Sequence, residues 1–209
     1  MLAKHHKPRP GDQQGTSWLS LLGHSKDSLW SVDLFRCESL TIKSYWVLVV
    51  MDQWSRQIIG FGIHQGPVDG IAVCRRFNDV ISGTDPPCYV SSDNDPLFRF
   101  YRWKANLRIL EVMEINSIPY VPMSHPFIER VIGTIRREYL DHVPFWNSLD
   151  LERKLGEFKD YYNHYRTHVA LSGLPPAKFG QQTNQAYVNI NDYGWRQHCR
   201  RLFHTPIPT

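Results

Sequence analysis

The stretch Ser91-Ser92-Asp93-Asn94-Asp95 directly follows a short apolar run, and the organisation of the remaining chain can be worked out from it. Thirty-five residues lie between Asp93 and Glu129, which comes just after the proline that begins a helix-like pattern at position 126. Upstream, Asp33 interrupts an apolar, strand-like run, where a carboxylate is costly unless it has a partner. Two aspartates on strands and a glutamate on a helix can converge on hard divalent cations, which take oxygen ligands.

Each of these three carboxylates also has a purely local explanation. Asp33 could be an edge-strand or turn residue, Asp93 could close an Asx-turn, and Glu129 could interact with the dipole of its own helix. In this order and at this spacing, the three together favour one shared site. Two cations in such a site can clamp the attacking and leaving oxygens of a phosphoryl transfer.

Composition narrows the class of protein without deciding it. The chain has 209 residues, which suits one domain with extensions, and its net charge of +4 favours an anionic partner only weakly. No two of the four cysteines have Cys-x-x-Cys spacing, so we expect reduced thiols in a cytoplasmic protein. Because no run of eighteen apolar residues occurs, we expect no membrane-spanning helix.

Hydrophobic patterning predicts an α/β protein with a five-stranded mixed sheet flanked by helices. Three consecutive strands joined by short turns indicate an antiparallel meander. Ser148 is the expected cap of the last long helix. We predict strands at 29–35, 45–51, 56–64, 88–90 and 109–115, and helices at 68–82, 97–107, 126–141 and 149–165. Residues 1–27 are predicted as a flexible arm, 28–180 as the core domain and 181–209 as a polar tail.

Several motifs resemble the catalytic core of the retroviral integrase superfamily, the ribonuclease H-like polynucleotidyl transferases, in particular that of bacterial insertion-sequence transposases. The resemblance covers roughly residues 28–180, and the spacing between Asp93 and Glu129 is part of it. The segments that carry it are Trp30-Ser31-Val32-Asp33, Val50-Met51-Asp52-Gln53-Trp54-Ser55-Arg56 with Ile59-Gly60, Ser92-Asp93-Asn94, Tyr120-x-Pro122, Ile128-Glu129-Arg130, Thr134-Ile135-Arg136-Arg137-Glu138, and the run from Tyr162-Asn163 through Arg166, His168, Leu171 and Gly173 to Pro176.

The resemblance implies a ribonuclease H-like fold with Asp33, Asp93 and Glu129 as a catalytic and metal-binding acidic triad. It implies two Mg²⁺ or Mn²⁺ ions as cofactors. It also implies a DNA transposase or integrase that hydrolyses a phosphodiester at the end of a mobile element and then joins the freed 3′-hydroxyl to target DNA. The protein itself would supply positioned oxygen ligands and charge neutralisation.

The sequence departs from the family pattern at two positions. Asp95 stands where the family usually has glycine, and it could tune the metal site or cap a helix that starts at Pro96; we favour the cap. His125-Pro126 stands where Asn-Gly is usual, and His125 could contact DNA or belong to a turn.

Basic residues near the acidic motifs are candidates for phosphate binding. Arginine can hold phosphates bidentately, so we expect Arg130, Arg136 and Lys104 to contact DNA. The alternative is a solvated helix face on which these cations pair with neighbouring acids. Asp52 and Arg56 are expected to be structural, whereas the segment containing Tyr162, Asn163 and Arg166 could pack a helix or touch DNA.

Two other functions remain open: a decayed or domesticated core that binds DNA without catalysis, and a metal-dependent nuclease of the same fold. The resemblance implies DNA as partner and a homo-oligomer as the active form. It also implies a cytoplasmic, bacterial location, with nucleoid association when the protein is bound to DNA. Only about 27 residues precede the core, too few for the helix-turn-helix domain of related transposases, so we expect a separate DNA-binding chain or no sequence-specific recognition.

Overall fold

The computed structural model of the chain describes residues 29–93, 95–116, 126–180 and 193–208. Five strands form one mixed sheet in the order β3-β2-β1-β4-β5. The first three strands make the predicted antiparallel meander, and β4 and β5 are parallel to β1. Their bounds are β1 (Leu29–Glu38), β2 (Ser44–Asp52), β3 (Ile58–Gln65), β4 (Tyr89–Ser92) and β5 (Met113–Asn116). The predicted five-stranded α/β sheet is therefore confirmed.

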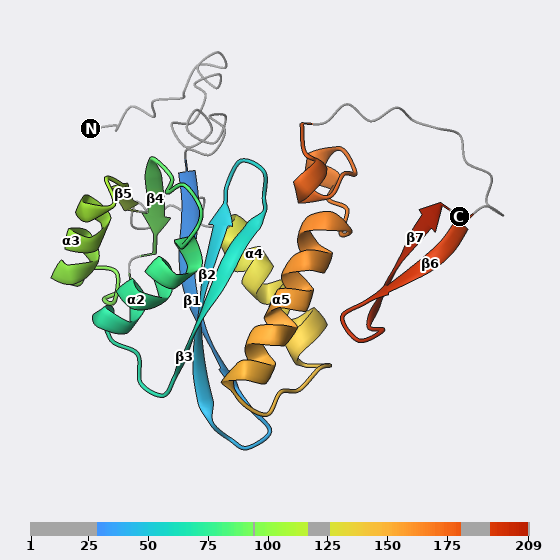
Figure 1. Ribbon diagram of the computed structural model, residues 1–209, viewed down its shortest axis with the longest axis horizontal. Helices are drawn as coiled ribbons and strands as arrows, with labels where there is room; N and C mark the ends of the chain where they lie inside the picture. Colours follow the sequence, from blue (N-terminus) through green and yellow to red (C-terminus); the bar gives the residue numbers. More distant parts are fainter. Residues whose placement is uncertain (1–28, 94, 117–125, 181–192, 209) are drawn as a thin grey trace, which may run out of the picture.

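Helices cover both faces of this sheet (Figure 1). The first pair, α2 (Gly70–Ile81) and α3 (Tyr101–Ile109), packs on one face, and the second pair, α4 (Pro126–Thr134) and α5 (Ser148–His164), packs on the other. Two separate apolar cores result. The continuous apolar run of β2 contributes side chains to both cores, because successive side chains of a strand point to opposite faces. No helix among the described residues combines the length and apolar character of a membrane span.

Alternate residues of β2 divide between these two cores. Val47 and Val49 pack in the core of α4 and α5, whereas Leu48 and Val50 pack in the core of α2 and α3. All four side chains are almost fully buried. A valine-rich run without alternation is what a strand covered on both faces requires, so the sequence pattern and the layered architecture agree.

Two glycines in β3 let α2 approach the sheet closely. A Cβ atom added at Gly62 would lie 2.6 Å from Cβ of Arg76 and 3.1 Å from its backbone oxygen. A Cβ added at Gly60 would lie 2.8 Å from a methyl group of Val80. The Arg76 backbone cannot yield without moving the helix, so glycine at position 62 sets the distance between α2 and β3.

Several element boundaries differ from those predicted. The helix predicted at 97–107 begins only at Tyr101, and the strand predicted at 109–115 begins at Met113, after Glu111 adopts a left-handed backbone (φ 57°). The helix predicted at 126–141 is observed as α4 followed by a π-helical turn, η1 (Ile135–Leu140). The cap of α5 is Asn147, whose side chain accepts a hydrogen bond from the N–H of Asp150 (2.9 Å); Ser148, the predicted cap, is the first helical residue.

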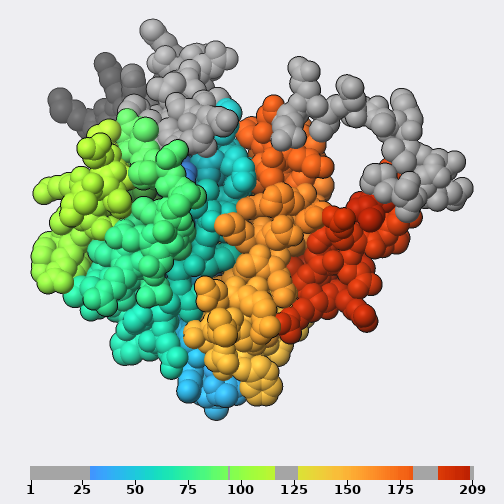
Figure 2. Space-filling view, viewed as in Figure 1, coloured from blue at the N-terminus to red at the C-terminus, as the bar shows by residue number. Residues whose placement is uncertain are grey.

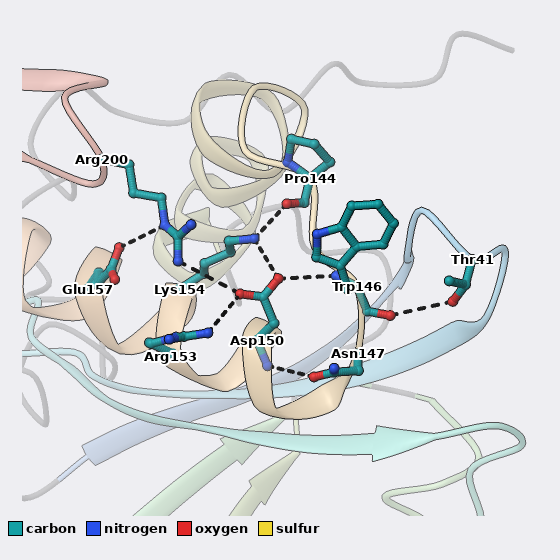
Figure 3. A network of polar contacts seen from close by, with 9 residues as sticks. All are labelled: Thr41, Pro144, Trp146, Asn147, Asp150, Arg153, Lys154, Glu157 and Arg200. Atoms are coloured by element: carbon teal, nitrogen blue, oxygen red, sulfur yellow. Dashed lines mark hydrogen bonds and ion pairs between the residues drawn. The ribbon is translucent and has the colours of Figure 1, made fainter.

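A buried ion pair lies within the first turns of α5 (Figure 3). The Lys154 ammonium is 3% exposed and donates hydrogen bonds to Asp150 (2.7 Å) and to the backbone oxygen of Pro144 (2.6 Å). Arg153 and Arg200 also approach Asp150, at 3.3 and 3.8 Å. A buried charge destabilises a protein unless it is paired and hydrogen-bonded. Lys154 and Asp150 meet both conditions, and their network also joins α5 to the loop before it.

The C-terminal residues contain a hairpin that the sequence analysis did not predict. Strands β6 (Tyr193–His198) and β7 (Phe203–Pro208) pair in antiparallel fashion, apart from the main sheet. The hairpin lies beside α5 (Figures 1 and 2), where the Phe203 ring stacks on Tyr161 with ring centroids 4.4 Å apart. Exposed positions alternate poorly along β6, so its sequence lacks the pattern that predicts a half-buried strand.

We predict that Gly62→Ala lowers the free energy of unfolding by about 1–3 kcal/mol, since the added methyl group overpacks the contact between β3 and α2. Gly156→Ala is the matched control, because Gly156 is in α5 and a Cβ there meets nothing within 4 Å. That substitution should be neutral or stabilise the protein by up to about 1 kcal/mol through helix propensity. Urea unfolding of both variants measures the difference, and equal losses would contradict the close approach of α2.

Candidate active site

Asp33 lies on β1, and Asp93 directly follows β4, the neighbouring parallel strand. In the β1–β4 ladder Val32 pairs with Ser92, so each aspartate comes one residue after this pair. Neighbouring strands are about 4.8 Å apart, which brings the two side chains to the same part of the sheet. The interrupted apolar pattern at Asp33 and the end of the short strand at Ser92 are the sequence signals that predicted this.

The environment of Asp33 is partly buried and negatively charged. Burial raises the pKa of Asp33 to about 6, and the negative charges of Asp93, Glu129 and Asp95 add to the rise. The backbone N–H of Leu34 donates a hydrogen bond to Oδ1 of Asp33 (2.7 Å), which partly offsets the rise in its pKa. The three acids predicted from the sequence therefore interact electrostatically, together with Asp95.

Glu129 reaches this region on the first turn of α4. Its neighbours Ile128 and Val131 are 0% and 2% exposed and anchor the helix in the core, whereas Glu129 is exposed. The helix contacts β1, the strand of Asp33. The apolar stripe of α4 thus leaves the glutamate outside the core on the side where its charge acts on Asp33.

The donor set suits a hard divalent cation. Within residues 29–93, 95–116, 126–180 and 193–208, no three His, Cys, Asp or Glu side chains are close enough together to hold a metal ion. Burial is the main cause of the raised pKa of Asp33, and the negative charges of Asp93 and Glu129 raise it further. A divalent cation would offset these negative charges, and carboxylate oxygens are the ligands that Mg²⁺ prefers.

Asp52 builds a tight turn between β2 and β3. Its carboxylate accepts hydrogen bonds from the backbone N–H of Trp54 (3.3 Å) and from the N–H and hydroxyl of Ser55 (2.8 and 2.5 Å). The side chain is nearly fully buried by this turn. Arg56 follows in a left-handed backbone conformation (φ 65°), which is why β3 begins at Ile58 and not at 56 as predicted. The structural role expected for Asp52 is confirmed.

Arg56 connects this turn to the start of α4. The guanidinium carbon of Arg56 lies 3.1 Å from the centroid of the Phe127 ring, a close cation–π contact two residues before Glu129. Burial lowers the pKa of Arg56 to about 10, an effect opposed by Tyr162 and Asp52 and increased by Arg130. At neutral pH Arg56 remains charged, so it stabilises the first turn of the helix that carries Glu129.

The C-terminal part of α5 holds the same turn from the other side. The Asn163 side chain accepts a hydrogen bond from the N–H of Ile58 (2.9 Å) and donates one to its carbonyl (2.9 Å). Lys159 donates to the carbonyl of Ile59 (2.5 Å), and the Trp54 ring packs edge-on against Phe179 (5.3 Å). The sequence left open whether Asn163 packs a helix or touches DNA; in the structure it binds β3.

Other carboxylates near the motifs have structural partners. Glu114 accepts hydrogen bonds from the Ser92 hydroxyl (2.8 Å) and the Trp103 indole (2.9 Å), so it holds the strand end before Asp93. Glu138 forms a bidentate ion pair with Arg166 (2.8 and 3.3 Å). No signal in the sequence pointed to the role of Glu114, because its partners come from two other elements.

The basic candidates lie in different places. Arg130 follows Glu129 and is close enough to Arg56 to affect its pKa. Arg136 is exposed on η1 and lines a cavity of about 580 Å³ with Cys37 and Phe145. Lys104 is exposed on α3, on the other face of the sheet. Of the three, Arg130 is the one on the helix of Glu129, directly after it.

Two further sequence predictions concern the loops around the site. Asp95 accepts a hydrogen bond from the N–H of Leu97 (2.8 Å) and so caps the turn that follows, while its charge also acts on Asp33. His125, with Tyr120 and Pro122 of the predicted motif, lies outside the described residues, as does the predicted arm at 1–27.

This fold, a five-stranded mixed sheet with helices on both faces, is ribonuclease H-like. Residues 111–176 match the family model of the integrase core domain. The chain is 25% identical over 162 residues to an insertion element IS476 protein of 39.2 kDa from Xanthomonas euvesicatoria. It is 30% identical over 112 residues to the transposase InsD of insertion element IS2 from Escherichia coli.

Solved structures share the fold at low sequence identity. A chain of the simian T-cell lymphotropic virus intasome in complex with PP2A regulatory subunit B56 gamma has a TM-score of 0.61 and 15% identity, covering 81% of this chain and 62% of that one. The HTLV-2 integrase catalytic core domain in complex with magnesium has a TM-score of 0.57 and 17% identity, and the match covers 75% of this chain and 98% of that domain. The fold is therefore that of integrase catalytic cores, and the sequence is similar to those of insertion-sequence transposases.

The chain spans half or less of the length of the curated relatives it matches. The alignments cover 75% of this chain and 46% of the IS476 protein, and 53% of this chain and 36% of the IS2 transposase. The similarity thus concerns the core and not the whole of either relative.

We predict that Arg56 and Phe127 stabilise each other by about 0.5–2 kcal/mol, since the guanidinium is partly desolvated over the ring. A double-mutant cycle with Arg56→Met and Phe127→Leu, followed by urea unfolding, measures this coupling. Arg102 and Tyr101 form the matched control pair: their contact is longer, at 5.7 Å, and exposed. A coupling at positions 56 and 127 no larger than that of the control would contradict the proposed stabilisation of α4.

Proposed function

We propose that this protein is a DDE-type polynucleotidyl transferase that cleaves DNA phosphodiesters and transfers strands during transposition or integration. The observation that carries the proposal is the placement of the acids on an integrase-type fold: Asp33 and Asp93 each come one residue after the paired Val32 and Ser92, and Glu129 is on the first turn of α4, which contacts β1. Asp33, Asp93 and Glu129 are the proposed catalytic and metal-binding residues. The family match and the relatives support DNA as the substrate.

The residues of this chain act by holding and orienting charge. The triad carboxylates would bind two Mg²⁺ or Mn²⁺ ions, which supply Lewis-acid activation and charge neutralisation at the phosphodiester when bound. A structural relative is described in complex with magnesium. Glu114 holds the strand end at Ser92, and the Arg56–Phe127 contact holds the helix start near Glu129, so both position carboxylates without touching substrate.

Positive residues and further chains complete the proposal. Arg130, Arg136 and Lys104 are the proposed phosphate contacts, with Arg130 supported best because it directly follows Glu129 on α4. HTLV-2 integrase is described in dimeric and trimeric forms, which supports a homo-oligomer here as the active form. We also propose a separate helix-turn-helix chain as the source of sequence recognition, and action in the bacterial cytoplasm on nucleoid DNA.

We predict that Asp93→Asn abolishes metal-dependent cleavage and strand transfer, since a neutral amide is a poor ligand for a hard cation. Asp79→Asn is the matched control, because Asp79 is exposed on α2, where it pairs with Arg76. The control should leave the rate unchanged. The assay uses oligonucleotides carrying the terminal repeats of the element with Mg²⁺ or Mn²⁺. Equal losses in both variants would contradict the triad, and cleavage without strand transfer would indicate a nuclease.

We predict that divalent metal raises the thermal stability of the wild type, because ligands that bind only the folded state stabilise it by mass action, by about 2.7 kcal/mol at a hundredfold excess over Kd. Asp33→Asn should show a smaller metal effect and a more stable metal-free form, since one repelling charge is removed. Thermal unfolding with and without excess Mg²⁺ or Mn²⁺ measures both. An equal metal shift in wild type and variant would favour a non-catalytic core.

A further inference from the structure

A groove separate from the acidic site lies between the end of α5 and the C-terminal hairpin. Its volume is about 990 Å³, and its walls come from three parts of the chain: the last turns of α5 with the residues after it, the segment around Lys178, and both strands of the hairpin. The space-filling view shows the hairpin beside α5 (Figure 2). No part of the acidic triad lines this groove.

Ring contacts hold the hairpin that forms one wall. Phe203 stacks on Tyr161 with an interplanar angle of 4°, and His198 packs on Tyr165 with ring centroids 4.2 Å apart. Arg200 reaches back to Glu157 of α5 (3.7 Å). Aromatic pairs stabilise packing beyond the area they bury, so the hairpin is held on α5 and forms a binding surface with it.

The two faces of α5 serve different parts of the molecule. Asn163 binds β3, and the hydroxyl of Tyr162 lies near Arg56, on the side of the sheet. Tyr161 and Tyr165 face the hairpin. The helix therefore separates the groove from the turn that supports the acidic site.

The charged side chains that line the groove are mostly cationic. Arg166, Lys178 and Arg196 contribute three positive charges, and the carboxylate of Asp160 is the single acidic group in the lining. The Asp160 carboxylate already contacts His164: Oδ1 of Asp160 lies 3.0 Å from Nδ1 of His164. Arg166 is paired with Glu138.

Two of these cations have no carboxylate partner among the described residues. Arg196 donates a hydrogen bond to the Tyr165 hydroxyl (2.6 Å), and its guanidinium lies 5.3 Å from the centre of that ring. Lys178 follows Pro176 at the end of a short 3₁₀ turn and forms no ion pair within the same residues. Their charge is thus available to an anionic ligand.

We propose that this groove is a second DNA-binding surface that takes the phosphate backbone through Lys178 and Arg196. Lysine and arginine side chains in a groove bind the phosphate backbone of DNA without reading its sequence. The volume is at the upper end of the range for small-molecule pockets, which favours an extended ligand over a small anion. The inference rests on the proposed function, since it takes DNA to be the substrate.

The test measures the affinity of the full chain for a fluorescent duplex oligonucleotide at a series of salt concentrations. Each lost phosphate contact should lower the slope of log affinity against log salt by about one unit. The variant Lys178→Ala, Arg196→Ala should therefore lose about two units of slope and bind more weakly at low salt. Lys43→Ala, Arg75→Ala is the matched control, because both residues are exposed, Lys43 at the β1–β2 turn and Arg75 on α2.

Further variants separate a lost contact from a displaced hairpin. Arg196→Lys keeps the charge and should keep the slope, while Lys178→Glu lies outside the hairpin and should reduce affinity without changing thermal stability. A slope that is unchanged in the double variant, or lowered equally in the control, overturns the inference.

A different result would contradict the proposed function itself. If the wild type neither binds DNA nor cleaves it with Mg²⁺ or Mn²⁺, both proposals are wrong. If the wild type binds and cleaves DNA while the groove variants match it at every salt concentration, only the groove is wrong.

Discussion

The pair of hydrogen bonds between Asn163 and the backbone of Ile58 joins the helical layer to the sheet at the start of β3. One part of the support for the acidic site is attached to that point. The Asp52 turn precedes it, and Arg56, held in a left-handed conformation by that turn, packs on Phe127. Because the backbone groups of Ile58 are buried, they need partners, and Asn163 supplies both with one side chain.

This support allows the protein to keep carboxylates where they are unfavourable. Asp33 is partly buried among three other acids, and its pKa is raised to about 6 as a result. Active sites commonly give up stability for function in this way. The compensation lies in neighbouring elements: Glu114 bonds Ser92 and Trp103, and Ile128 anchors the helix of Glu129 in the core. The acidic side chains are therefore held in place by contacts of the strands and the helix that carry them.

The helix α5 connects this centre to the C-terminal part of the molecule. One of its faces binds β3 and the other carries the rings that hold the hairpin. Near its N-terminus a buried Lys154–Asp150 pair fixes it to the preceding loop, and Arg200 of the hairpin turn extends the same network (Figure 3). A single helix thus sets the relation between the sheet and the cationic groove.

Local pattern was enough to predict much of this protein from sequence alone. Strong period-two and continuous apolar runs marked β1, β2 and β3, and the out-of-pattern Asp33 marked the site, because burial and chain periodicity are properties of the sequence itself. Turn residues whose partners are close in sequence, such as Asp52, could also be predicted. The boundaries of α3 and β5 were not, since a left-handed residue at Glu111 is set by its surroundings.

What only the tertiary structure decided depends on contacts between distant residues. The Arg56–Phe127 contact, the Asn163–Ile58 bonds and the partners of Glu114 join separate elements, and no periodicity encodes them. The hairpin was missed for the same reason, because its stability comes from rings on α5 and not from its own alternation. The sequence by itself determined the sheet, its helices and the acidic residues; the tertiary structure decided which charges meet, since electrostatic energy depends on distance in space and not along the chain.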